Sequence, residues 1–337
     1  MFDNQRPGIY SRVEISGGQT GGGAHAALLL PSREDESPGV FGLESPQDAP
    51  ALLAGNDLAL RCSALLFEGG AGQVSVITSE SAAQALEALD ALGGVRAVVS
   101  GFTHPGELTA LRDFAEQSSA GQRECIAFAG IGSPQAAINA ADSLRSGRVV
   151  LCCPALRLEE GEAHPLYGAC ALAAAVLGAR TPTHNFSGQV FPSLREDAPL
   201  PEQTVQSLLR AGVSVFERSG EQVELIRALS TDPPRESGGG SLRCLSTLLI
   251  IDDVVMGIRA VLREKLRGAG RATIEGIRDQ VAVALAAKKD MGTISSFAPP
   301  RCRADKNDPG ICVVEISFGV AHLLNKIHLT AHIRVSS

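Results

Sequence analysis

Two glycine-rich stretches have the spacing that could bind a phosphate group. The first, GGQTGGG at 17–23, lacks the Lys-Ser/Thr ending of a P-loop, and no helical pattern follows it directly. The second runs from Gly130 to Ser133, after a predicted strand and before a predicted helix, where a helix N-terminus can bind an anion. It lacks the third glycine and the later acid of a dinucleotide fingerprint. We interpret the first stretch as a tether and keep the second as an alternative ligand site.

Neighbouring carboxylates and histidines offer the other candidate chemistry. Asp252 and Asp253 lie in LLIIDDVVMGIR, where consecutive helix positions point about 100° apart, so the two do not readily share one metal ion. His328 and His332 share a strand face but lie about 13 Å apart along it, too far to chelate one ion. No HExxH, GxSxG or paired-carboxylate spacing occurs. We therefore predict no catalytic residue, cofactor or metal, and interpret the aspartates as a polar helix face.

The composition is that of a globular protein. The 337 residues are 44% hydrophobic and 20% charged, long enough for roughly two domains. A net charge of −7 with scattered Lys and Arg leaves no basic stripe, so we expect no nucleic-acid partner. No apolar run reaches the roughly 18 to 20 residues of a membrane span, and MFDNQRPGIY lacks the apolar core of a signal peptide. We expect no membrane partner and synthesis in a cytoplasm.

Alternating patterns place a lone strand near each end of the chain. Residues 9–16 lie between a proline-glycine pair and the glycine tether. Their side chains alternate in direction along a predicted strand, so that Ile9, Val13 and Ile15 share a face. Residues 326–335 alternate up to the last residues of the chain. A strand with no local partner must pair with a sheet edge in this subunit or in another one.

Between the ends, the pattern predicts an α/β domain. Strand-like runs at 74–78, 95–101, 125–130 and 149–153 alternate with helix-like runs at 81–92, 107–118 and 134–146. This order favours a mainly parallel sheet that is covered on both faces. A small-residue helix at 167–177, a helix at 202–211 and strands at 213–218 and 223–229 follow. Two long amphipathic helices at 245–267 and 273–289 precede a strand-like run at 312–318.

Several segments together resemble the sheath proteins of contractile phage tails and related bacteriocins. In chain order they are RPGIYSRVEIS, ALAAAVLGARTPTHNFSGQVFP, LLRAGVSVFE, RCLSTLLIIDDVVMGIRAVLREKL and ICVVEISFGVAHLLNKIHLTAHIRV. The resemblance covers both ends and most of 166–335, whereas 24–158 matches only in general architecture. It implies an arm and tether at 1–23, an outer α/β domain at 24–165, a C-terminal α+β core domain at 166–325 and a donor strand at 326–337.

The resemblance also implies a function and a set of partners. Sheath subunits stack as hexameric rings around a tail tube, between a baseplate and a tail terminator protein. They contract to drive the tube through a host envelope, and the assembled sheath is part of the virion. Terminal arms add strands to sheets of neighbouring subunits, so the C-terminal sheet is completed by those arms. The strand residues implied are Ile9, Tyr10, Val13, Ile15, Val313, Val314, Ile316, His328, Leu329, Ala331, Ile333 and Val335.

The same resemblance places the tube-facing surface on one of the two long helices. The candidate contacts are the basic residues Arg259, Arg263, Lys265, Arg267, Lys288 and Lys289. The alternative interpretation is that this charged face is an ordinary solvated helix surface without a binding function.

Eight cysteines without a CxxC pair are interpreted in two ways. They are either buried reduced thiols or, because a sheath works outside the cell, disulfides between subunits. Cys302 lies in the polar segment PPRCRADKNDPG, predicted as a loop, and Cys312 follows it; both are first candidates. Cys62, Cys153 and Cys244 are second candidates. The competing interpretations of the whole chain are a doubly wound α/β enzyme with a site near Gly130, and another self-assembling shell or tube protein.

Overall fold

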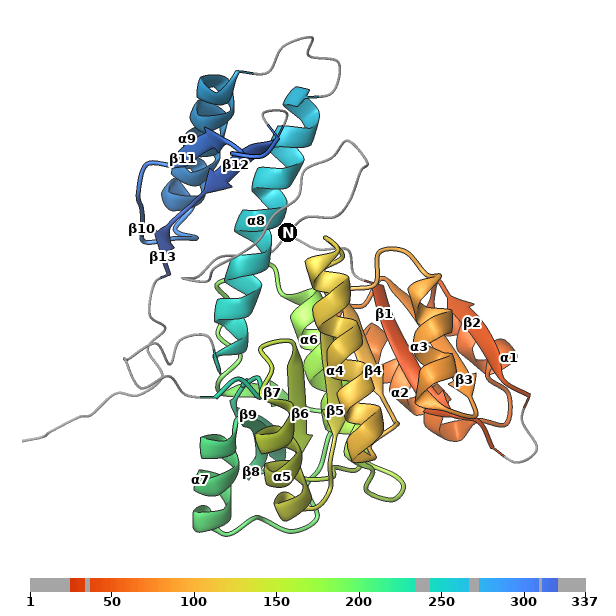
Figure 1. Cartoon of the computed structure of the whole chain (residues 1–337). Coiled ribbons are helices and arrows are strands. Elements are labelled where there is room, and N and C mark those ends of the chain that lie inside the picture. Colours follow the sequence, from red (N-terminus) through yellow and green to blue (C-terminus); the bar gives the residue numbers. More distant parts are fainter. Residues whose placement is uncertain (1–24, 34–36, 234–242, 267–272, 309–310, 321–337) are drawn as a thin grey trace, which may run out of the picture.

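Figure 1 shows the computed structural model of the protein, which describes residues 25–33, 37–233, 243–266, 273–308 and 311–320. A large sheet with helices on both faces forms one body, and a smaller helical and stranded body lies beside the far half of a long helix. The two predicted terminal strands, at 9–16 and 326–335, lie outside the described residues.

The large sheet has nine strands in the order β2-β3-β1-β4-β5-β6-β8-β9-β7. From β3 to β8 in this order neighbouring strands are parallel, while β2, β9 and β7 pair antiparallel. The strands are β1 (His25–Pro31), β2 (Gly39–Leu43), β3 (Gln73–Ser79), β4 (Ala97–Ser100), β5 (Ile126–Gly130), β6 (Val149–Cys153), β7 (Gln189–Phe191), β8 (Val213–Ser219) and β9 (Gln222–Arg227).

The central strands are short apolar runs because both of their faces are covered. In β1, Leu28 lies opposite Val76 of β3 and Val99 of β4, and all three side chains are fully buried. One face is covered by α1 (Ala49–Leu52), α2 (Asp57–Glu68) and α6 (Pro165–Gly178), preceded by the short 3-10 helix η1 (Pro46–Asp48). The other is covered by α3 (Ala82–Asp90), α4 (Pro105–Ala120), α5 (Pro134–Leu144) and α7 (Glu202–Ala211). The predicted two-sided, mainly parallel sheet is confirmed.

Local capping chemistry begins several of these helices where the sequence predicts. Ser81 accepts a hydrogen bond from the amide of Gln84 at the start of α3, and Ser133 accepts one from Ala136 at the start of α5. Asn56 does the same for Ala59 at the start of α2, a helix that the sequence pattern does not predict. Each cap satisfies one of the amide donors that the first helical turn leaves unpaired.

The smaller body has its own core. It contains the far part of α8 (Leu245–Leu266), α9 (Ile274–Asp290) and two antiparallel pairs of strands. The pairs are β10 (Ser296–Phe297) with β13 (Phe318–Gly319), and β11 (Arg301–Ala304) with β12 (Cys312–Glu315). Its buried apolar residues are Val254, Ile258, Leu262, Val281, Leu285, Ile294 and Phe318.

The predicted domain boundary between residues 165 and 166 differs from the structure. Strands β7, β8 and β9, together with α6 and α7, belong to the same sheet and cores as the preceding strands and helices. The reason is packing: α6 is apolar on all sides and lies buried against β4, β5 and β6, so the large body cannot end before it. The boundary between the bodies instead falls within α8, whose first turns join the large core and whose later turns join the small one.

Candidate assembly surface

Helix α8 links the two bodies because its side chains contact residues that lie just before three neighbouring parallel strands. Arg96 precedes β4, Glu124 lies two residues before β5, and Arg148 precedes β6. On α8, Met256 contacts Arg96, Arg259 pairs with Glu124 and Asp252 pairs with Arg148. These three α8 residues are spaced four and then three positions apart, so they share one face of the helix.

The first contact is a buried bidentate ion pair. The guanidinium of Arg148 donates to both carboxylate oxygens of Asp252, at 2.5 and 2.6 Å. Asp252 is 2% exposed. Burial alone would lower the pKa of Arg148, but the adjacent Asp252 carboxylate raises it above its ordinary value. The interpretation of Asp252 as part of a polar helix face is wrong, because its side chain is buried and pairs with Arg148 of the large body instead of with a residue on its own helix.

A second buried pair joins Arg259 to Glu124, with both side chains less than a tenth exposed. Between the two pairs, the guanidinium of Arg96 lies 2.7 Å from the sulfur of Met256. Charged groups that are buried must be paired, so these contacts fix how α8 sits against the large sheet.

Helix α9 is attached to α8 by a further ion pair. Lys288 of α9 contacts Asp253 of α8, and its side chain packs over Gly257, where an added Cβ would lie 3.3 Å from the lysine Cε. Burial raises the pKa of Asp253, and the Lys288 ammonium opposes that rise. Asp252 and Asp253 therefore serve different bodies, one on each side of α8.

These contacts decide which predicted tube contacts are available at the surface. Arg259 is 6% exposed and is paired with Glu124, so it is buried and we drop it as a surface contact. Lys288 is partly buried between the two long helices. Arg263 is exposed and donates to the side-chain oxygen of Gln122 at 2.6 Å, and Lys289 is exposed near the end of α9. The side chain of Lys265, and Arg267 altogether, lie outside the described residues.

The two small sheets have open edges in the described part of the chain, because each contains only two strands. In β12, Val314 packs toward the small core, and Ile316 beyond it does the same. Val313 points to the other face, opposite Arg303. The β11–β12 pair packs against α9, which supports one of its faces, while its outer edges are unpaired within the described residues and could receive a further strand.

The cysteines are reduced and differ in accessibility. Cys62 and Cys153 are fully buried, which excludes them as sites of disulfides between intact subunits. Cys244, Cys302 and Cys312 are partly exposed. Cys302 lies on β11 rather than in a loop, and its strand neighbours are Arg301 and Arg303.

The alternative ligand site near Gly130 is filled by the protein itself. A Cβ added at Gly130 would lie 1.8 Å from the carbonyl oxygen of Pro165, so the start of α6 closes over the end of β5. Ser133 is engaged as the cap of α5. In the described residues, no cluster of three or more His, Cys, Asp or Glu side chains could hold a metal ion, and none of the helices is long and apolar enough to cross a membrane.

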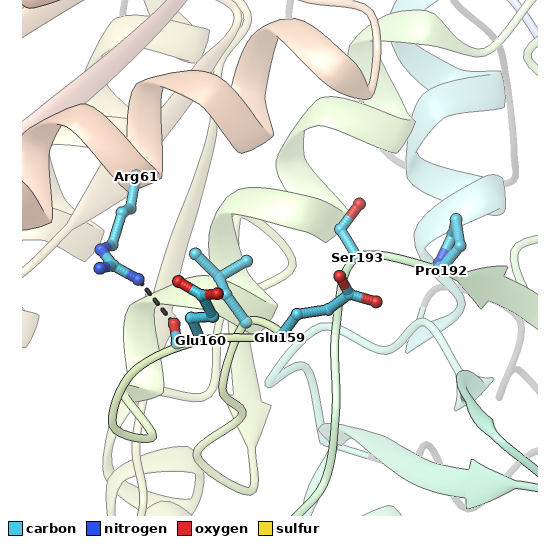
Figure 2. A pocket seen from close by; sticks show the side chains of 6 residues that line it. Arg61, Glu159, Glu160, Pro192 and Ser193 are labelled. Carbon is cyan, nitrogen blue, oxygen red and sulfur yellow. Dashed lines mark hydrogen bonds between the residues drawn. The ribbon is translucent and has the colours of Figure 1, made fainter.

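A hollow of about 510 Å³ lies elsewhere, between α2 and the loops at 158–160 and 192–193. Figure 2 shows Arg61 on one side of it, with the guanidinium donating to the backbone carbonyl of Glu160 at 2.7 Å. Glu159 pairs with Arg195, and Ser193 contacts Glu68. The side chains of Arg61, Glu159 and Ser193 are thus engaged with other protein groups, and the hollow opens widely to solvent.

The comparisons with known proteins concern the fold. No family model matches the sequence, and no curated protein matches it. The contracted helical sheath of the anti-feeding prophage matches with a TM-score of 0.70 at 13% identity, over 98% of this chain and 99% of that one. The sheath tail protein of Desulfitobacterium hafniense matches with a TM-score of 0.68 at 11% identity, over 93% and 100% of the two chains.

A sheath tail protein of Listeria innocua matches with a TM-score of 0.66 at 10% identity, over 90% of this chain and 96% of that one. Because nearly the whole of each chain is covered, the likeness includes both bodies and their arrangement. The protein therefore has the fold of tail sheath proteins, with the mixed α/β architecture predicted from the sequence.

Proposed function

We propose that this protein is the structural subunit of a contractile tail sheath and has no catalytic role. The observation that carries the proposal is the end-to-end likeness to the anti-feeding prophage sheath, which covers both bodies. Subunits stack in hexameric rings around a tail tube, between a baseplate and a terminator protein. They assemble in the host cytoplasm, form part of the tail particle and contract to drive the tube through an envelope.

The described contacts support a subunit that moves as one piece. Two buried ion pairs hold α8 to the large sheet, and the pair between Lys288 and Asp253 holds α9 to α8. Breaking a buried pair leaves an uncompensated charge, so relative motion of the bodies is costly. Rearrangement of the lattice would then occur at joints between subunits rather than within one subunit.

The joints proposed are added strands. The strand donors are the residues at 9–16 and 326–335, outside the described residues, and the receiver is the sheet that contains Val313, Val314 and Ile316. Main-chain hydrogen bonds along an open sheet edge join two chains without requiring a large rigid interface. The glycine tether at 17–23 would let the bodies rotate while the strands remain paired.

For the tube-facing surface, we propose exposed residues of α9 and, separately, an exposed residue near the end of α8. Val283 of α9 and Met291, the residue that caps the C-terminal end of α9, are 64% and 66% exposed and are the two most exposed large apolar side chains in the described part of the chain. Lys289 lies between them in the sequence, and Arg263 lies on the α8 face that contacts Gln122 of the large body. We keep Lys289 and Arg263 as proposed contacts without the buried Arg259, and add Val283 and Met291.

Deletion of residues 1–23 tests the proposed joint. The truncated protein should keep the melting temperature of the full chain but should not polymerise, because the arm would contribute to other subunits and little to its own core. Electron microscopy and thermal melting of both proteins provide the measurement. A variant with 17–23 replaced by an equally long Gly-Ser linker keeps the arm and should polymerise. Normal sheaths from the truncated protein would refute the arm assignment.

A further inference from the structure

The register of the β11–β12 pair brings two cysteines onto one face of a two-stranded sheet. Cys302 lies opposite Val314, and Ala304 lies opposite Cys312. Because side chains alternate along a strand, Cys302, Ala304, Cys312 and Val314 all project from the same face. Cys302 and Cys312 are therefore diagonal neighbours across the sheet.

The twist of the pair shortens this diagonal. On the opposite face, Arg303 lies opposite Val313 but forms its ion pair, at 3.1 Å, with Glu315 two residues further on. The two faces of a twisted antiparallel pair are related by an approximate two-fold axis along the strands. The twist that brings Arg303 toward Glu315 on one face thus brings Cys302 toward Cys312 on the other.

The two thiols lie near each other and are accessible. Each thiol influences the pKa of the other, in keeping with their diagonal placement in the strand register, and both residues are partly exposed. Burial raises the pKa of both thiols, while the positive charge of Arg278 on α9 lowers that of Cys302. Attack by the thiolate is therefore slowed at neutral pH but not prevented.

We infer that Cys302 and Cys312 of one subunit form a disulfide that cross-links strands β11 and β12 under oxidising conditions. The oxidant class is a low-molecular-weight disulfide, RSSR. One cysteine thiolate attacks RSSR and releases one thiolate RS⁻; the other then attacks the protein sulfur of the mixed disulfide and releases a second RS⁻. The protein loses two hydrogen atoms and two electrons, and RSSR is reduced to two RSH.

This site differs from the disulfides between subunits expected from the sequence. A thiol already nearby within the same hairpin competes at a far higher effective concentration than a thiol on another molecule. The linkage would fix the register of β12, the proposed receiving strand, outside the reducing cytoplasm. The chemistry itself does not depend on the sheath function. Cys244 then remains the partly exposed cysteine available to a neighbour, among those the structure describes.

The test uses the full-length protein, with oxidised glutathione as the oxidant at alkaline pH. Free thiols are then alkylated, and the protein is digested with trypsin without reduction. Cleavage after Arg301, Arg303, Lys306 and Lys326 separates the cysteines into peptides 302–303 and 307–326. The expected product is these two peptides joined, with the mass of their sum less two hydrogen atoms. Alkylation of both cysteines after oxidation would overturn the inference.

An isotope experiment distinguishes a linkage within one molecule from one between two. Equal amounts of unlabelled and nitrogen-15 protein are mixed before oxidation, and joined peptides of mixed label would overturn the inference. Cys244→Ser is the matched control and should leave the linkage unchanged, whereas Cys312→Ser should abolish it. Cys62 and Cys170 provide an internal reference, since their thiols also lie near each other but are fully buried. They should be alkylated only after unfolding, which verifies that the linkage formed in the native fold.

Discussion

At the scale of single residues, the charges that fix α8 against the large sheet are buried in the middle of that helix. Asp252 and Arg259 lie seven residues apart on one face of this helix and pair with Arg148 and Glu124 of the large body. Each pair removes two charges from water, and the cost is offset only while both partners remain in place. The main effect of these residues is therefore to fix one arrangement of the two bodies, and their net contribution to the free energy of folding is small.

The first prediction concerns Asp252→Asn. The amide cannot neutralise Arg148, whose guanidinium is largely buried, so the free energy of unfolding should fall by about 3 to 5 kcal/mol. Chemical denaturation of the variant and the parent measures the difference. The double variant Asp252→Leu with Arg148→Met removes both charges and should recover most of the loss. Equal losses in the single and double variants would show that packing, rather than the unpaired charge, is responsible.

A second residue-scale prediction concerns Glu196, which is 7% exposed. Its Oε2 accepts a hydrogen bond from the Arg218 amide, while its Oε1 has no partner among the described residues. Burial raises the pKa of Glu196, and the nearby Glu217 adds to the rise. As the pH falls from neutral through this raised pKa to the ordinary 4.5, the folded state binds the proton first, so stability increases.

Glu196→Gln should therefore stabilise the protein at neutral pH, and the gain should shrink toward zero near pH 4.5 and below. Denaturation curves across this pH range test the expectation. Glu221→Gln, an exposed position at the turn between β8 and β9, is the control and should change little at any pH. A Glu196→Gln variant that is less stable at neutral pH, with the same pH dependence as the parent, would contradict the account.

At the scale of elements, the sequence predicts those parts whose pattern is local. The strands at 126–130 and 149–153 and the helices at 202–211 and 245–266 follow from hydrophobic periodicity. Strand β1 is missed because HAALLLP is a short apolar run beside a glycine tether, without alternation. Strand β11 is missed because RCRA carries two arginines and sits between prolines and a polar turn.

The candidate site is harder to predict than the fold, because its residues meet across long stretches of chain. The burial of Asp252 cannot be inferred without its partner Arg148, and no residue near either one in the sequence indicates that the two pair. The only local signal is a charged residue at or just before the start of each of three predicted strands, together with opposite charges at positions 252 and 259 of a predicted helix. The proximity of Cys302 to Cys312 depends on β11, which has no recognisable pattern.

A third prediction concerns the proposed C-terminal donor strand, which lies outside the described residues. Leu329→Pro removes a main-chain donor and should block assembly while shifting the melting temperature of the unassembled subunit only slightly. Ser337→Pro, at the last position of the chain, is the matched control and should assemble normally. Sedimentation and thermal melting report the two properties separately. A Leu329→Pro protein that assembles as the parent does would remove this segment from the proposed joint.

At the scale of the whole molecule, the protein combines a rigid large body with small sheets whose edges are open in the described part of the chain. The large sheet is covered on both faces, and its edge strands β2 and β7 are short. The small body instead presents two-stranded sheets over a limited core of seven buried apolar residues in the described part of the chain. This contrast is expected of a protein that reaches its full stability only in an assembly.

Cryo-electron microscopy of the full-length protein, assembled by itself or on a tail tube, tests this claim most directly. The account predicts stacked rings of six subunits in which a strand from a neighbouring subunit pairs with the open edge of the sheet that contains β12. The ion pairs between Arg148 and Asp252, and between Arg259 and Glu124, should be intact in every subunit. An assembly whose β11–β12 sheet receives no strand from a neighbour, or a protein that stays monomeric with and without the tube, would contradict it.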